Sequence, residues 1–167
     1  SGTARTIGAT IGGNAITSTL PTITVNPGAV SLAQSTVTVG ASALLSGAST
    51  TLTLIARDAA GNRLASGGLA VVFTKGTGTS DGMISAVTDG SDGLYTATFA
   101  ATTSGTARTI SATIGGLPLT STAPTITVTP GAPSPATSTL TLSRSALVVG
   151  DTATLELTAR DAAGNLV

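Results

Sequence analysis

One stretch of sequence occurs twice in this chain of 167 residues. SGTARTIGATIGG at residues 1–13 returns as SGTARTISATIGG at residues 104–116, an offset of 103 residues. The same offset aligns residues 1–64 with residues 104–167 without a gap, and 42 of the 64 pairs are identical. Self-similarity at a fixed period indicates an array of like structural units. One unit is therefore 103 residues long, a usual size for a small β-sandwich domain.

The unit boundaries are expected at two Pro-Gly pairs, Pro27-Gly28 and Pro130-Gly131. Proline cannot donate to a strand ladder and glycine accepts a positive φ, so sheet pairing should stop there. We predict that residues 1–28 are the C-terminal strands of one unit and that residues 29–130 form a complete unit. Residues 131–167 would then be the N-terminal strands of a third unit.

The composition favours an all-β fold. Threonine, serine and valine are abundant, aromatic residues make up 2% and charged residues 8%. Branched side chains pack well on a pleated sheet and lose rotamer freedom in a helix. Period-two alternation predicts about seven short strands in the complete unit, which is typical of an immunoglobulin-like sandwich. The predicted strands cover residues 36–39, 51–57, 69–74, 83–88, 94–99, 107–114 and 119–128.

Alternation also predicts which side chains face the interior. Tyr95 should bury its ring and bond a backbone group through its hydroxyl, which argues against a sugar-binding platform built on Tyr95, Phe73 or Phe99. Pro124 falls inside the seventh predicted strand and indicates an edge position or a bulge. The predicted core consists of Val37, Val39, Leu52, Leu54, Val71, Phe73, Ile84, Tyr95, Phe99, Ile110, Ile114, Ile126 and Val128.

Several segments together resemble the bacterial immunoglobulin-like repeats of invasin- and intimin-type adhesins. They are STVTV, TLTLIARDAAGN, the apolar VVF strand and DGLYTATF. In those families the Asp-x-x-Gly-Asn turn and the Asp-Gly-x-Tyr-x-Ala segment recur in each domain; here they stand at Asp58 to Asn62 and Asp92 to Ala97. The resemblance implies a tandem sandwich array that acts as a spacer. It does not identify a receptor or a ligand.

Catalysis and cofactor binding are not expected. The chain has no His and no Cys, which excludes histidine acid-base chemistry and thiol nucleophiles. Lys75 is the single lysine, and we interpret it as a solvated charge rather than half of a Ser-Lys pair. The net charge is zero, so a nucleic-acid partner is not expected either. No apolar run is long enough to span a bilayer.

The aspartates in glycine-rich turns are candidate metal ligands. Asp81, Asp89 and Asp92 are candidates for calcium, which prefers carboxylates and backbone carbonyls. We interpret them instead as residues that close turns by bonding their own downstream backbone. Asp58 and Asp161 have the same interpretation, with a calcium site shared at the unit junction as the alternative. The neighbouring pair Arg57 and Asp58 is expected to be an exposed, weak interaction.

We expect this chain to be a structural spacer in a large extracellular bacterial adhesin or surface fibre. Very short links between near-identical units should give a semi-rigid rod, whose partners are the neighbouring repeats of the same chain. A second hypothesis is a subunit that assembles with like chains into a filament or sheath by lateral contacts or strand exchange. A third is a spacer within a secreted enzyme.

Overall fold

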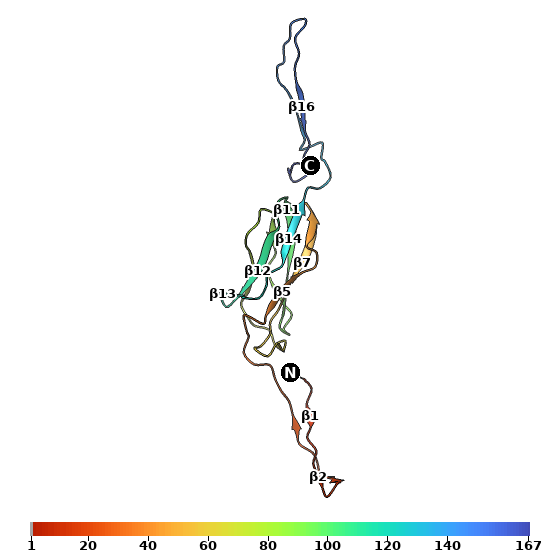
Figure 1. Cartoon of the computed structure of the whole chain (residues 1–167), viewed down its shortest axis with the longest axis vertical. Coiled ribbons are helices and arrows are strands. Elements are labelled where there is room, and N and C mark those ends of the chain that lie inside the picture. Colours follow the sequence, from red (N-terminus) through yellow and green to blue (C-terminus); the bar gives the residue numbers. More distant parts are fainter. Residues whose placement is uncertain (1) are drawn as a thin grey trace.

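The computed structural model describes residues 2–167 and contains strands but no helix in that range. A β-sandwich occupies the middle of an elongated chain, and a thin hairpin extends from each end of it (Figure 1). Each hairpin runs away from the sandwich and then turns back toward it (Figure 1). The all-β prediction is confirmed.

The first sheet of the sandwich is antiparallel and contains five strands in the order β10-β11-β7-β5, with β9 also pairing with β11. The long strand β11 pairs with β7 over residues 94–100 and with β9 over residues 99–103. These five strands are β5 (Thr36–Val39), β7 (Ser49–Ile55), β9 (Asp81–Ile84), β10 (Thr88–Asp89) and β11 (Leu94–Thr103).

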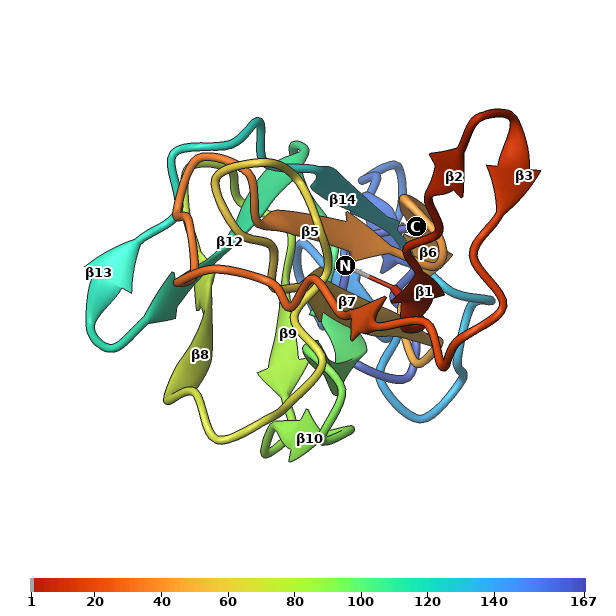
Figure 2. The same ribbon diagram turned by 90° about the horizontal axis from the view of Figure 1, so that it is seen from below.

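The second sheet has the order β13-β12-β14-β6, with β8 also pairing with β12. Its pairs are antiparallel except β14 with β6, which are parallel. The chain therefore moves from the edge of the first sheet at β5 to the edge of the second at β6. At the opposite side, β8 and β9 lie close together (Figure 2) and line a common hollow. The strands are β6 (Ala43–Leu45), β8 (Val71–Lys75), β12 (Arg108–Ile114), β13 (Leu117–Pro118) and β14 (Thr125–Thr129).

The core follows the alternation of the strands. Eleven of the thirteen predicted core residues are buried, while Val39 and Ile84 are half-buried against them, so the interior prediction is confirmed. Small or isolated residues complete the interior and were not predicted. These are Leu44, Ala56, Ala97, Ala101, Ala112 and Leu119.

Two strand predictions were wrong. The predicted seventh strand begins only at Thr125, and β14 lies between β12 and β6 rather than at an edge. Pro124 precedes β14, where its carbonyl accepts the N–H of Ile110 at 2.8 Å, so the proline leaves the ladder intact. The predicted strand 83–88 is divided into β9 and β10 by residues 85–87.

The end segments are similar in sequence to the core strands but have no second sheet to cover them in the described residues. β1 (Arg5–Thr6) pairs with β4 (Thr22–Ile23), β2 (Thr10–Ile11) with β3 (Asn14–Ala15), and β15 (Thr139–Leu142) with β16 (Leu155–Thr158). Ile23 is 54% exposed, whereas its equivalent Ile126 is fully buried. Sequence alone therefore does not bury these residues, because burial requires the rest of the sandwich.

Candidate functional site: the junction between repeats

The turn at residues 161–165 is built by Asp161. One carboxylate oxygen, Oδ1, accepts the N–H groups of Ala163 at 3.0 Å and Asn165 at 2.9 Å. The N–H of Asp161 in turn donates to the Asn165 carbonyl at 2.9 Å. Gly164 has a φ of 86°, a value that glycine adopts without strain. The sequence Asp-x-x-Gly-Asn thus specifies a closed turn, as predicted.

The second carboxylate oxygen of Asp161 fixes the link to the sandwich. Oδ2 accepts the N–H of Gly131 at 2.9 Å, and the Asp161 side chain is buried. A Cβ at position 131 would lie 3.3 Å from the Ser46 carbonyl oxygen, a tight contact, so glycine permits this close approach. The Pro-Gly link is therefore held by a buried carboxylate and does not hang free.

Asn165 connects the turn to the end of the sandwich. Its Oδ1 accepts the N–H of Ser104 at 2.9 Å, and its Nδ2 donates to the Thr102 carbonyl at 2.8 Å and the Ser46 hydroxyl at 3.1 Å. Ser46 lies between β6 and β7, and Thr102 lies at the end of β11. We call this set of four residues, Ser46, Thr102, Ser104 and Asn165, the junction clamp.

A shallow hollow of about 420 Å³ accompanies the clamp. Small residues line most of it, among them Gly47, Ala101, Ala162 and Ala163. The hollow lies between the end of the sandwich, at Ser46 and Thr102, and the turn that contains Asp161. The site is therefore suited to holding two parts of the chain together.

The turn at residues 58–62 repeats this geometry at the other end of the sandwich. Asp58 Oδ2 accepts the N–H of Gly28 at 3.0 Å, and Oδ1 accepts those of Ala60 at 3.0 Å and Asn62 at 2.9 Å. Both Pro-Gly links are thus held by the aspartate of the turn that follows them.

The expectation of an exposed pair between Arg57 and Asp58 was wrong. Asp58 is buried, and the Arg57 guanidinium donates to the Gly61 carbonyl at 2.8 Å. Arg160 makes the equivalent bond to the Gly164 carbonyl at 2.8 Å. The arginine guanidinium therefore stabilises the backbone of its own turn, while the aspartate carboxylate accepts backbone N–H groups.

Hydrogen bonds favour the ionised form of both turn aspartates. The N–H of Gly28 and the side chain of Asn62 lower the pKa of Asp58 from its usual 3.8 to about 2. Burial by itself raises the pKa of Asp161, but hydrogen bonds from Asn165 and Gly131 outweigh it and hold that pKa well below the usual range. Both carboxylates are charged at neutral pH.

The three candidate calcium ligands are not brought together. Asp89 accepts the N–H groups of Gly68 at 2.7 Å and Ser91 at 2.8 Å, as expected for a turn residue. Asp92 pairs with Arg63, which lowers the pKa of this carboxyl. Residues 2–167 contain no cluster of three or more His, Cys, Asp or Glu side chains that could hold a metal ion. Calcium binding by these aspartates was the alternative to turn closure, and it stays untested.

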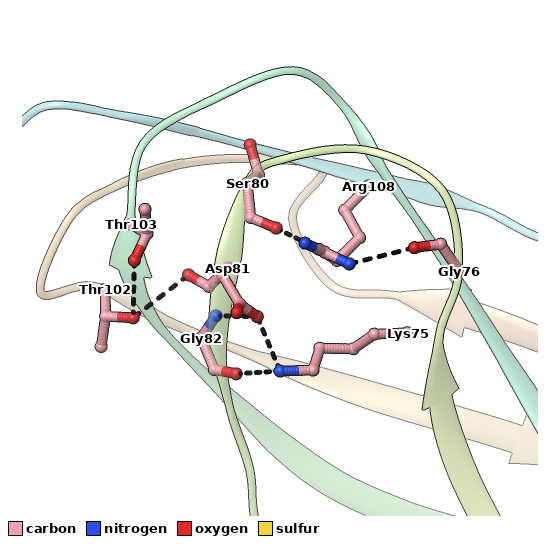
Figure 3. A network of polar contacts seen from close by, with 8 residues as sticks. All are labelled: Lys75, Gly76, Ser80, Asp81, Gly82, Thr102, Thr103 and Arg108. Carbon is pink, nitrogen blue, oxygen red and sulfur yellow. Dashed lines mark hydrogen bonds and ion pairs between the residues drawn. The ribbon is translucent and has the colours of Figure 1, made fainter.

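Asp81 belongs to a network that joins the two sheets (Figure 3). The Lys75 ammonium, on β8, donates to Asp81 Oδ1 at 2.6 Å and to the Gly82 carbonyl at 2.9 Å, both on β9. Hydrogen bonds from Lys75 and from the Gly82 N–H lower the pKa of Asp81. Arg108, on β12, reaches the Ser80 carbonyl and, at 3.0 Å, the Gly76 carbonyl. Lys75 is thus occupied as a cross-sheet ion pair.

Tyr95 is positioned as the alternation predicts. Its ring is 1% exposed, and its hydroxyl accepts the N–H of Leu69 at 3.1 Å. Phe73 and Phe99 are buried as well. None of these three aromatic side chains is exposed, so they provide no platform for a sugar.

The family follows from a direct comparison. A family model described as "Invasin, domain 3" matches residues 31–131, most of the chain. This chain belongs to the invasin domain 3 family. The resemblance to invasin- and intimin-type adhesins is therefore confirmed.

Solved structures agree with this assignment. The Escherichia coli adhesin FdeC is 32% identical, with a TM-score of 0.60 over 92% of this chain and 49% of that chain. InvD of Yersinia pseudotuberculosis is 26% identical, with a TM-score of 0.62 over 96% of this chain and 50% of that one. Invasin, described as a bacterial integrin-binding protein, shares the fold at 22% identity with a TM-score of 0.61 over 96% of this chain and 32% of its own.

These matched structures are longer than this chain. The invasin domain 3 chain spans about half the length of the FdeC and InvD structures, and no curated protein matches it. Two of the matched structures, FdeC and InvE of Yersinia pseudotuberculosis, are described as adhesins. The part of the chain that the structure describes contains no helix with the length and hydrophobicity of a membrane span.

The clamp partners on the sandwich were not predicted from the sequence. Asn165 and its equivalent Asn62 are identical in the two repeats, and this retention was a signal that the asparagine matters. It was interpreted as part of a closed turn, not as a contact with another repeat. Ser46 and Thr102 gave no signal, and Ser104 is repeated as Ser1 but is a common residue type that meets Asn165 only in the folded chain.

Proposed function

We propose that this chain is a stalk segment of a large extracellular bacterial adhesin, in which clamped junctions make the repeats a semi-rigid rod. The observation that supports this most strongly is Asn165, whose side chain bonds three residues of the preceding repeat. Three hydrogen bonds in addition to the Asp161–Gly131 bond restrict how far the link can swing.

The proposed division of the chain follows from the same contacts. Residues 1–28 end one repeat, residues 29–130 form a complete repeat, and residues 131–167 begin the next. Each Pro-Gly link lies directly against the aspartate turn of the repeat that it introduces, at Asp58 and at Asp161. The partners of each repeat are therefore the repeats before and after it in the same chain.

The surface chemistry suits an extended extracellular rod. Charged residues are few, and the outward-facing positions of the strands are rich in threonine, as in β7 and β11. A sandwich with strands of about ten residues adds roughly 30–40 Å to the length of the array, at about 3.3 Å for each residue. Repetition would place a terminal domain far from the cell envelope.

An alternative is a subunit that assembles with like chains by strand exchange. The sandwich itself offers strands at the edges of its two sheets, β5 in the first and β6 in the second. A strand edge of this kind is a template for strand addition from another chain.

Electron microscopy of the full-length native protein separates the two. The stalk proposal expects straight, unbranched rods whose length increases by roughly 30–40 Å per repeat. Freely bent chains of beads would contradict the rigid rod. Lateral sheets or filaments of many chains would favour the assembling subunit.

A further inference from the structure

Ser46 is held in place at the end of the sandwich. Its N–H donates to the Thr129 carbonyl at 2.9 Å. Its hydroxyl donates to the Thr102 carbonyl at 2.9 Å and accepts from Asn165 Nδ2 at 3.1 Å. The hydroxyl therefore lies between the sandwich and the turn of the following repeat.

Ser46 contributes a side-chain group to the clamp, whereas Thr102 and Ser104 contribute backbone groups. Asn165 also bonds the Thr102 carbonyl and the Ser104 N–H, which belong to the backbone and persist whatever the side chain is. In the clamp as defined above, the Ser46 hydroxyl is the one side-chain group supplied by the preceding repeat. Substitution at this position can thus alter the clamp directly.

The following repeat already carries such a substitution. Residues 42–44 and 145–147 share the sequence SAL, and the gapless alignment then places Val149 opposite Ser46. The turn keeps its shape, since Gly47 and Gly150 have φ values of 90° and 97°. The side chain of Val149 is fully exposed in this chain. The backbone is retained while the hydroxyl is replaced by a branched apolar group.

A branched apolar side chain does not fit the space that the hydroxyl occupies. An oxygen 3.1 Å from Asn165 Nδ2 is a hydrogen-bond partner, whereas a methyl carbon needs about 3.5–4.0 Å. A valine methyl in that place would push the amide outward and lengthen its bonds to Thr102 and Ser104. An alanine would leave both amide hydrogens satisfied, by Thr102 and by Asp161 Oδ2 at 2.8 Å.

We propose that the residue at the Ser46 position decides how firmly the next repeat docks. A small residue permits the clamp, and a branched apolar residue such as Val149 weakens it. The array would then contain junctions of two strengths, fixed by one side chain per repeat. This inference rests on the proposed function of the clamp and adds the feature by which one junction differs from another.

Amide hydrogen exchange in the whole 167-residue chain tests it. The reporter is the N–H of Ser104, which donates to Asn165 Oδ1, and the control is the N–H of Ile110 within the sandwich. Ser46→Val is expected to speed exchange at Ser104 about fivefold, the worth of roughly one net hydrogen bond. Ser46→Ala is expected to stay within about twofold of the wild type. Ile110 should be unchanged in both variants.

The Asn165→Ala variant separates the two levels of the argument. If it leaves exchange at Ser104 unchanged, the clamp itself is refuted, and with it the proposed function. If it speeds exchange while Ser46→Val behaves like Ser46→Ala, the inference about Ser46 is overturned and the clamp stands. If Ser46→Val speeds Ile110 as much as Ser104, the residue stabilises the sandwich as a whole, which also overturns the inference.

Discussion

The amide nitrogen of Asn165 lies 3.1 Å from the hydroxyl oxygen of Ser46, although 119 residues separate them in the chain. In the proposed division of the chain, Ser46 belongs to one repeat and Asn165 to the next. In the proposed stalk, this bond holds the end of one repeat against the turn of the repeat that follows. The proposed function depends on this contact rather than on a pocket within a repeat.

The low pKa of Asp58 predicts acid sensitivity. A carboxyl whose pKa falls from 3.8 to about 2 on folding contributes stability that is fully present above about pH 4. That contribution is lost as the pH falls from there through about 2. We expect the melting temperature to fall over this interval, and Asp58→Asn to make that part of the profile flatter. Circular dichroism from pH 7 to pH 2 measures both, and parallel profiles would contradict the assigned role.

Gly82, at the start of β9, occupies a position that has no room for a side chain. A Cβ at this position would lie 2.7 Å from the Phe99 ring and would overlap the Ala100 carbonyl. Gly82→Ala should destabilise the sandwich by about 1–3 kcal/mol, because the packed core cannot yield without shifting. Gly2→Ala is the matched control, since its Cβ would meet nothing within 4 Å. Equal urea midpoints for the two variants would contradict the packing.

Loss of the Tyr95 hydroxyl should destabilise the fold, because a backbone N–H would lose its partner. Tyr95→Phe keeps the buried ring but removes the oxygen that accepts from Leu69. We expect a loss of about 1–2 kcal/mol in the free energy of unfolding, because the Leu69 N–H would be left without its partner. Equilibrium unfolding in urea measures it. An unchanged midpoint would mean that water replaces the hydroxyl at no cost.

We predict that chelators do not change the thermal stability of the fold. Asp81 pairs with Lys75 and Asp92 with Arg63, so neither needs a cation for charge balance. The melting temperature should therefore be the same in EDTA and in millimolar calcium. Binding at a hundredfold excess over the dissociation constant would stabilise the fold by about 2.7 kcal/mol, which a melting curve resolves easily. Such a shift would contradict the prediction and would indicate that these residues bind calcium.

The interior of the sandwich could be predicted because its signal is local. Leu52, Leu54 and Tyr95 alternate with polar neighbours along their strands, and each side chain faces the core as that period requires. The closed turn at Asp161 was predictable for the same reason, since its first oxygen bonds residues two and four positions later.

Other features depend on distant parts of the chain. β6 has three residues and was not predicted, because its parallel pairing with β14 is settled by tertiary structure. The second carboxylate oxygen of Asp161 accepts the N–H of Gly131, which lies 30 residues earlier in the chain. No local sequence pattern predicts such a bond. Ser46 is one serine among many, and its role becomes visible only when two repeats are in contact.

The most direct test of the clamped rod is nitrogen-15 relaxation of the whole chain. If the clamp holds, residues 131–167 and the sandwich tumble together, with one anisotropic rotational correlation time that Asn165→Ala splits into two. Separate correlation times for the two parts already in the wild-type chain would contradict the account, because the junction would then be a flexible link.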